Sequence, residues 1–219
     1  MTLRRLLCIL AGLGSVPTTS PVAARPEPTS PVVQAAAAAG LRPAVLRLAL
    51  RAHARAQAAG LTTSPVLTVI DYSLPSRMRR LWVLDVRRGR VLARELVAHG
   101  RNSGDDVPQR FSNRSGSLQS SLGLFLTGRM YRGKHGLSLR LRGLEPQLNG
   151  RAEKRAIVVH GADYVSERTI AALGRLGRSQ GCPALDRAVA RRVIQLIRGG
   201  TALFAYHPSA ARESRLAAR

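Results

Sequence analysis

The stretch "LWVLDVRRGRVLARELVAH", residues 81–99, decides the fold class, because it holds two apolar runs on either side of a short polar turn. The runs cover residues 81–86 and 90–99, and their length is typical of β-strands. The Arg-Arg-Gly turn between them predicts a β-hairpin. We therefore expect paired strands in the middle of this chain.

Similar runs recur on both sides of this hairpin. Five more strand-like runs lie at residues 66–72, 122–131, 137–144, 156–161 and 202–206. Apolar residues at helical spacing predict one helix over residues 41–60, ending at Gly60, and another between Pro183 and Arg198, stopped by Gly199 and Gly200. The sequence therefore predicts a mainly β domain with a few short helices and an N-terminal helix.

The first residues resemble an export signal. Two arginines, an apolar run over residues 6–16 and small residues up to Ala24 match the three parts of a secretory signal peptide, which we place at residues 1–24. The run is too short to cross a bilayer, so we expect no transmembrane segment in the mature chain. An uncleaved anchor is the alternative. Export predicts a place in the periplasm or cell envelope.

Composition changes along the chain suggest the other boundaries. Residues 25–40 are rich in Pro, Ala, Thr and Ser and are interpreted as a flexible linker. Residues 41–207 form the expected domain, and residues 208–219 a basic tail. The polar stretch over residues 100–121 is too long for an ordinary turn, so we interpret it as a binding loop.

The charge is extreme, and it narrows the possible partners. The formal net charge is +23, carried almost entirely by arginine. An exported protein of this kind is drawn to anionic envelope polymers. Aromatic residues make up only 4%, which leaves few stacking platforms and argues against nucleic acid as a partner. Histidines and cysteines at ligand spacing are missing from the sequence, so no metal and no cofactor are expected.

Cys182 is the cysteine that would remain after export, because Cys8 lies inside the signal. Such a solitary thiol is buried and inert, paired with another chain, or reactive. Its sequence context favours reactivity. Gly181 would let substrate approach the backbone, and a helix directly after Pro183 would place the thiol near a helix N-terminus, where the dipole favours a thiolate.

His160 is the candidate base for this thiol. It ends the apolar run "AIVVH" and precedes Gly161, so its ring can emerge at a strand end. A thiol and an imidazole within hydrogen-bond reach make a nucleophile and its base. Amides near Gly181 can form an oxyanion site. A strand-end histidine is also often structural, and a Gly-Cys-Pro turn can be only a turn.

The order of several motifs resembles the L,D-transpeptidase (YkuD-like) family, and most closely its murein L,D-transpeptidase catalytic-domain subfamily. The similar segments, spread over roughly residues 44–206, are "RLWVLDV" at 80–86, "VAHGRNSG" at 97–104, "FSN" at 111–113, "GSLQSSLG" at 116–123, "YRGKHGLSLRLRGLE" at 131–145, "RAIVVHGADYVS" at 155–166 and "GRSQGCPAL" at 177–185. The resemblance implies an L,D-transpeptidase-like β-sandwich catalytic domain.

The resemblance also implies an activity on peptidoglycan stem peptides. Family members form a cysteine thioester at meso-diaminopimelate, release D-alanine and transfer the acyl group to an acceptor amine. Carried over, Cys182 is the nucleophile and His160 the base that later acts as acid. The carbonyl of Gly161 orients the imidazole, while Ser179 and the amides near Gly181 shape the oxyanion pocket.

One position departs from the wider family, which has histidine where this chain has Gln180. Glutamine cannot titrate, so the choice of acceptor is open. A hydrolytic L,D-carboxypeptidase with the same cysteine, and an idle basic wall-binding protein, are the alternatives. The expected substrate-binding residues are Gln180, Arg178, Asp163, His135, Tyr131 and Ser121. A structural role is the alternative for His135 and for His99, and a local turn for Asp163. His53 and His207 are interpreted as surface or terminal residues without a role.

Overall fold

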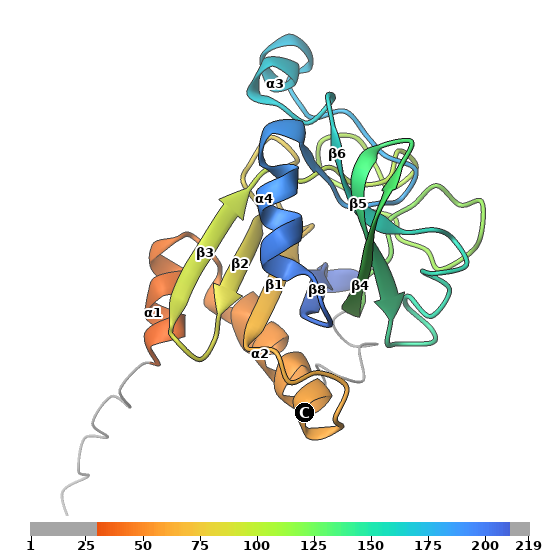
Figure 1. Cartoon of the computed structure of the whole chain (residues 1–219). Coiled ribbons are helices and arrows are strands. Elements are labelled where there is room, and N and C mark those ends of the chain that lie inside the picture. Colours follow the sequence, from red (N-terminus) through yellow and green to blue (C-terminus); the bar gives the residue numbers. More distant parts are fainter. Residues whose placement is uncertain (1–29, 211–219) are drawn as a thin grey trace, which may run out of the picture.

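A computed structural model describes residues 30–210 of the chain (Figure 1). The expected signal peptide and residues 211–219 of the expected tail lie outside the described residues. In chain order the elements are α1 (Pro31–Ala38), α2 (Pro43–Ala58), β1 (Val66–Asp71), β2 (Leu81–Asp85), β3 (Arg90–Glu95), β4 (Gly123–Gly133), β5 (Gly136–Gly143), β6 (Val158–Ala162), α3 (Glu167–Leu173), β7 (Ala184–Asp186), α4 (Arg187–Ile197), β8 (Ala202–Tyr206) and the 3₁₀ helix η1 (Pro208–Ala210).

The eight strands of residues 30–210 form one sheet in the order β3-β2-β1-β8-β4-β5-β6-β7. β1 pairs with β8 and β6 with β7 in parallel, and the other neighbours are antiparallel. The mainly β prediction is confirmed, and so is the hairpin, in which Leu81 faces Glu95 and Asp85 faces Arg90. β3 ends at Glu95, earlier than expected, because the chain then turns so that Ala98 bridges to Ala184.

Strands β1, β2, β6 and β8 are buried on both faces, which explains their nearly continuous apolar runs. Side chains alternate between the faces, so Leu67 and Trp82 join the core under α1 and α2. Ile70 and Val83 point the other way, into the core under α4. The helix α2, predicted over residues 41–60, therefore covers one face of the sheet (Figure 1).

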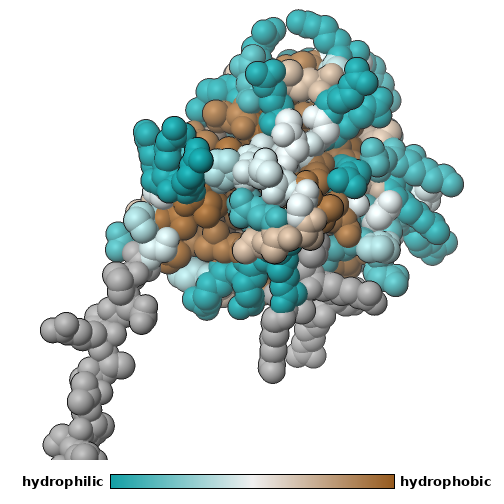
Figure 2. Space-filling model, turned by 60° about the horizontal axis from the view of Figure 1, so that its bottom comes forward, coloured by the Kyte–Doolittle hydropathy of each residue, from teal (hydrophilic) through white to brown (hydrophobic). Residues whose placement is uncertain are grey.

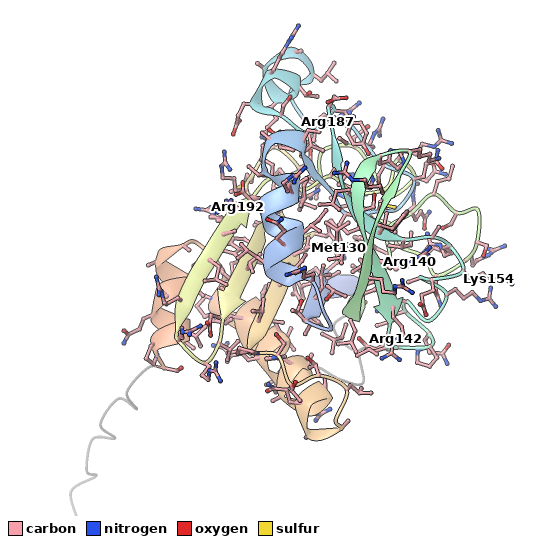
Figure 3. The ribbon with its side chains drawn as sticks, in the orientation of Figure 1. Met130, Arg140, Arg142, Lys154, Arg187 and Arg192 are labelled. Carbon is pink, nitrogen blue, oxygen red and sulfur yellow. The ribbon has the colours of Figure 1, made fainter. Side chains whose placement is uncertain are left out.

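Helix α4 is enclosed by the curved sheet in a sandwich-like arrangement. Its buried residues, Ala190, Val193, Ile194 and Ile197, lie on one helical face. It contacts β1 and β2 near one end of the sheet and β5, β6 and β7 near the other (Figure 1). Met130 of β4 packs against the same core and points toward α4 in the view of Figure 3.

The linker expectation is wrong for its second half, because residues 31–38 form helix α1. Val32 and Ala36 stand four residues apart and are buried against α2 and the sheet. The indole nitrogen of Trp82 donates to Ala39 O over 2.8 Å, which fixes the end of this segment. Alanine is the best helix former, so the alanine-rich run becomes a helix once it has a surface to pack on.

Helix α3 was not expected from the sequence. It has seven residues and none of them is buried, so it carries no apolar stripe that periodicity would detect. Capping residues at its two ends define this helix instead. Ser166 accepts a hydrogen bond from the amide of Thr169 over 3.1 Å at its start, and Gly174 ends it with a φ of 68°.

The surface is strongly hydrophilic. On the face turned forward in Figure 2, hydrophilic side chains project around the rim, and apolar residues lie between them. Exposed arginines on α2, β5 and α4 add to this surface, among them Arg47, Arg142 and Arg191. Within residues 30–210, no helix has the length and apolar character needed to cross a bilayer.

Candidate active site

Both candidate catalytic residues line one cavity of about 760 Å³. Five segments build its wall: the loop after β3, the β4–β5 hairpin, residues 155–160 at the start of β6, Tyr164 after β6, and the loop before β7. Cys182, His160 and Ser179 line it. The loop residues Arg101, Gly116 and Leu118 also line it, so part of the stretch over residues 100–121 lies at this cavity, as a binding loop would. Of the expected substrate-binding residues, Gln180, Arg178, His135 and Tyr131 line it as well.

His160 is held on β6 between two neighbouring strands. It pairs with Ser138 on β5 and with Ala184 on β7, and only 2% of the residue is exposed. Its Nδ1 lies 3.0 Å from the carbonyl oxygen of Gly161. A carbonyl can only accept, so Nδ1 carries the proton and Nε2 is the acceptor of the neutral ring. The family resemblance implied a contact of this kind for the Gly161 carbonyl.

The surroundings of His160 favour its neutral form. Burial lowers the pKa of this imidazole, and the positive charges of His135, Arg187 and Lys134 lower it further, against the opposing effect of the Gly161 carbonyl. The His135 ring stacks on it, with centroids 4.4 Å apart and planes 25° apart. Near neutral pH the Nε2 of His160 is therefore free to accept a proton.

Cys182 lies on the loop before β7, half-buried against the core under α4. Its Sγ is 3.8 Å from the carbonyl oxygen of Ala156. Burial raises the pKa of the Cys182 thiol, while the amide of Val158 and the charges of Arg155 and Lys134 act in the opposite direction. The resting pair is therefore a neutral thiol and a neutral imidazole.

The expected helix dipole at Cys182 is absent, which corrects the sequence interpretation. β7 comes between Cys182 and α4, and the helix begins only at Arg187. The effect of a helix terminus falls off within one turn. A strand of three residues is too short to recognise by periodicity, which is why the sequence suggested a helix directly after Pro183.

The hydroxyl of Ser179 fixes the conformation of the Cys182 loop. It donates to the carbonyl oxygen of Cys182 over 2.6 Å and accepts from the amide of Gly181 over 3.0 Å. Gly181 has a φ of 121°, and a Cβ there would lie 2.8 Å from Gln119 O. This glycine is needed for close packing on residue 119 and does not open space for substrate, which is a second correction.

A neighbouring segment clamps this loop from the other side. The amide of Ser179 donates to His99 O over 2.9 Å, and the amide of Arg101 donates to Ser179 O over 2.8 Å. His99 is fully buried; its Nδ1 lies 2.8 Å from Arg80 Nη2 and its Nε2 3.2 Å from Gly104 O. The structural alternative for His99 is therefore the one that the hydrogen bonds support.

Arg80 was not recognised from the sequence. Its guanidinium is fully buried and donates to Leu74 O over 2.6 Å and to Val97 O over 3.0 Å. It also lies over the ring of Tyr72, 5.2 Å from the centroid. Burial lowers the pKa of Arg80 to about 10 and raises the pKa of Tyr72 to about 12, so the pair is a cation and a neutral phenol at neutral pH.

Arg155 is the other residue that sequence reasoning missed. It lines the cavity and donates to Ser112 O over 2.6 Å and to Gln119 O over 2.5 Å, and it also contacts Ser117 Oγ and Ser121 Oγ. It therefore ties residues 112–121 of the loop to the segment that precedes β6. Nothing in the sequence distinguishes it from the other arginines.

Two expected substrate-binding residues lie outside the cavity lining. Asp163 forms an exposed ion pair with Arg187, with contacts of 2.5 Å and 2.8 Å. Ser121 is buried, and its hydroxyl donates to Ser112 O over 2.9 Å. Asp163 therefore serves a local contact and Ser121 the wall behind the site.

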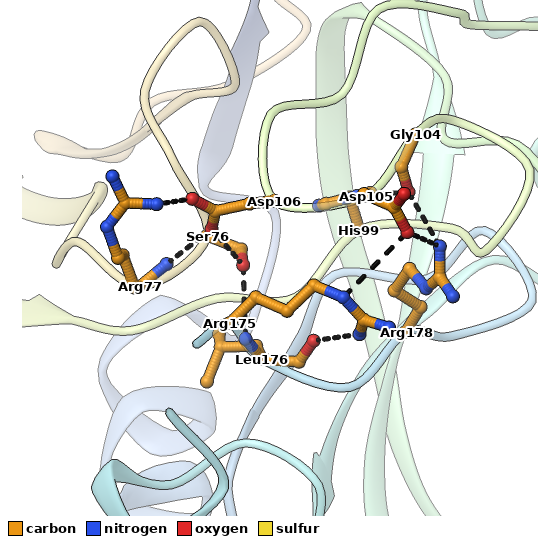
Figure 4. Close-up of polar contacts among 9 residues, drawn as sticks. All are labelled: Ser76, Arg77, His99, Gly104, Asp105, Asp106, Arg175, Leu176 and Arg178. Atoms are coloured by element: carbon orange, nitrogen blue, oxygen red, sulfur yellow. Dashed lines mark hydrogen bonds and ion pairs between the residues drawn. The ribbon is translucent and has the colours of Figure 1, made fainter. Parts of the chain in front are cut away.

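Three more residues from the sequence analysis are held by neighbouring groups. Arg178 lines the cavity, but its Nη1 is 2.6 Å from Asp105 Oδ1 and 3.1 Å from Gly104 O (Figure 4). His53, expected at the surface, is 2% exposed, and its Nε2 lies 2.9 Å from the carbonyl oxygen of Ser64. His207 packs on the ring of Phe111 at 4.7 Å between centroids.

The family follows from the sequence match. A model of the L,D-transpeptidase catalytic domain matches residues 37–206, well over half of the 219 residues. The chain belongs to the L,D-transpeptidase catalytic domain family. Both Cys182 and His160 fall inside the matched part.

Solved structures of L,D-transpeptidases are similar in part. One from Mycobacterium smegmatis is 14% identical, with a TM-score of 0.41, and the match covers 66% of this chain and 59% of that one. Another from Xylanimonas cellulosilytica is 17% identical, with a TM-score of 0.42, and covers 70% of this chain and 68% of that one. A search of curated proteins found no match. This L,D-transpeptidase domain thus spans less than two thirds of the mycobacterial chain.

Proposed function

We propose that this L,D-transpeptidase domain cross-links peptidoglycan by acyl transfer through Cys182. The observation that supports the proposal is the shared cavity, whose lining includes both a cysteine and an oriented, buried histidine from separate segments. The family match agrees with that chemistry. The proposed donor is a stem tetrapeptide that ends in meso-diaminopimelate and D-alanine.

In the first half of the reaction, Nε2 of His160 takes the thiol proton while Sγ of Cys182 attacks the carbonyl carbon at the L-centre of diaminopimelate. Because the resting pair is neutral, this proton transfer accompanies the attack. The tetrahedral intermediate then collapses, the carbon–nitrogen bond breaks, and His160 gives its proton to the departing D-alanine amine. A thioester remains on Cys182.

In the second half, the amine of a neighbouring stem attacks the thioester and gives a proton to His160. The new amide forms as the carbon–sulfur bond breaks, and the sulfur regains the proton from His160. Water in place of the amine would give the hydrolytic product. The proposed oxyanion donor is the amide of Cys182, because the amide of Gly181 already donates to Ser179.

The proposed setting is the cell envelope. The signal-like residues 1–24 support export, and the net charge of +23 suits a wall rich in anionic polymers. Stem peptides are the proposed substrates and anionic envelope polymers the proposed surroundings. Both statements rest on the sequence and on the family.

The decisive experiment measures product and protein masses after incubation with a disaccharide-tetrapeptide. A cross-linked dimer that has lost one D-alanine supports transfer, and a tripeptide monomer indicates hydrolysis. We expect Cys182→Ala and His160→Gln to abolish both products. His207→Gln, a change outside the cavity, is the control and is expected to keep them. Unchanged substrate with no adduct on Cys182 would refute the proposed function and favour a binding protein.

A further inference from the structure

The cavity has a one-sided charge. Arg101, Lys134, Arg155 and Arg178 line it. Among the residues that the structure describes, none of the side chains lining this cavity is acidic. A concave site lined by one sign of charge concentrates ligands of the opposite sign.

Two of these four cations already have partners. Arg155 is half-buried and is held by the carbonyl oxygens of Ser112 and Gln119. Arg178 is held by the carboxylate of Asp105, 2.6 Å away (Figure 4). Both groups are committed to the protein itself, so Arg178, which the sequence favoured for substrate, is the weaker candidate.

The other two cations are exposed and have no such partner. Within residues 30–210, the side chains of Arg101 and Lys134 make no hydrogen bond and no ion pair. Their backbones are nevertheless fixed at the site. The amide of Arg101 donates to Ser179 O, next to the Cys182 loop, and Lys134 precedes His135, whose ring stacks on His160.

We propose that Arg101 and Lys134 form an anion subsite that makes the enzyme select stem peptides with free carboxylates over amidated ones. This inference rests on the proposed function, because it names which stem peptides the same cavity takes. A free carboxylate pairs with either cation, whereas a carboxamide has no charge and offers only one acceptor oxygen. One cation is attached to the nucleophile's loop and the other to the segment beside the base.

The test is a binding measurement on the Cys182→Ala protein, which cannot turn substrate over. Calorimetry compares a tetrapeptide whose glutamate and diaminopimelate carboxylates are free with the same peptide carrying carboxamides there. We expect the free peptide to bind several-fold more tightly. Arg101→Gln and Lys134→Gln should each reduce that preference about two- to fivefold, because exposed charge pairs are weak. Affinity for the amidated peptide should not change.

Arg142→Gln is the matched control, because it removes one exposed positive charge on β5 outside the cavity lining. It should leave the preference intact. Equal affinity for both peptides, no binding of either, or a preference that survives the double Arg101→Gln/Lys134→Gln change would overturn the subsite. The same two peptides are then given to the protein with Cys182. Selective binding without products would refute the proposed function alone, and turnover without selective binding would refute the subsite alone.

Discussion

His135 covers His160: the two rings stack with their centroids 4.4 Å apart and their planes at 25°. His135 sits at the exposed tip of the β4–β5 hairpin, whereas His160 is 2% exposed on β6. The outer ring therefore shields the inner one from solvent and also places a titratable group against it. Lys134 on the same tip and Arg187 on α4, itself paired with Asp163, also act on His160, and Cys182 lines the same cavity.

Removal of the outer ring should change the pH dependence of the reaction. The pKa of His160 is lowered from 6.5 by burial and by nearby positive charge, so the acid limb of kcat/KM should lie below pH 6.5. His135→Ala exposes His160 and removes one charge, and both effects raise its pKa. We therefore expect the limb to move up toward pH 6.5, measured with the tetrapeptide from pH 4.5 to 8.

His135→Phe separates the two causes, because it keeps a stacked ring and removes the charge. If the acid limb of His135→Phe stays near its wild-type position, the shift in His135→Ala comes from the loss of shielding. A limb that moves as far as in His135→Ala would assign it to charge. Identical profiles for the wild type and both variants would contradict any influence of His135 on the base.

Ser179→Ala should slow the proposed reaction by misplacing Cys182, the proposed nucleophile. The change leaves the amide of Gly181 and the carbonyl of Cys182 without the hydroxyl that joins them. It should lower the free energy of unfolding by about 1–3 kcal/mol. A loop displaced by about 1 Å can cost roughly 100-fold in rate. Steady-state kcat, together with the urea midpoint, measures both effects.

Ser166→Ala provides the matched control for that change. It also removes a serine hydroxyl that holds a backbone amide, at the start of α3, and should cost about 1 kcal/mol of stability. Since the residues of α3 are not among those that line the cavity, kcat should stay close to wild type. An equal loss of kcat in both variants would show that instability, not loop geometry, explains the Ser179 result.

Replacement of Arg155 should lower the stability of the protein and the reactivity of the Cys182 thiol. Arg155→Met removes the hydrogen bonds to Ser112 and Gln119, and it removes a charge that lowers the pKa of Cys182. We expect a lower urea midpoint and slower alkylation of Cys182 by iodoacetamide at pH 7.5. Arg155→Lys keeps the charge but not the fork of donors. It should lose stability while keeping most of the alkylation rate, and equal rates in wild type and Arg155→Met would contradict the electrostatic part.

The sequence predicts those parts of the fold that local patterns specify. The hairpin of β2 and β3, helix α2 and strand β6 follow from periodicity and turns. The expectation that His160 ends its strand is wrong, because β6 continues to Ala162 through its pairing with β7. Helix α1 was misjudged because its stability comes from Val32 and Ala36 packing on the sheet, a contact that composition does not show. The three residues of β7 are too few to have a period.

The site was predictable only where residue types are rare. Cys182 and His160 stand out in a chain with few cysteines and histidines, and the structure places both at one cavity. Arg155 and Arg80 are hidden among 35 basic residues. Their significance comes from partners far away in the chain, such as Ser112, which is 43 residues from Arg155. Only the fold reveals such contacts.

The buried pair of Arg80 and His99 should make stability depend on pH. Burial, with the charge of Arg80, lowers the pKa of His99 to about 4, against 6.5 for an ordinary histidine. A histidine that is neutral in the folded state and easily protonated in the unfolded state contributes stability above pH 6.5. That contribution, about 3 kcal/mol, is lost as the pH falls from 6.5 to 4.

His99→Gln removes this dependence, because glutamine can accept from Arg80 and donate to Gly104 O but cannot titrate. In urea unfolding between pH 7.5 and 4, the free energy of unfolding of His99→Gln should fall less than that of wild type. The difference should equal the contribution of His99. Carboxylates titrate equally in both proteins, so the difference isolates His99. Parallel curves would mean that the pKa of His99 does not change on unfolding, which would contradict this prediction. The carbonyl of His99 also accepts from the Ser179 amide, so protonation here should loosen the Cys182 loop, and alkylation of Cys182 should reveal that loosening at a pH where the protein is still folded.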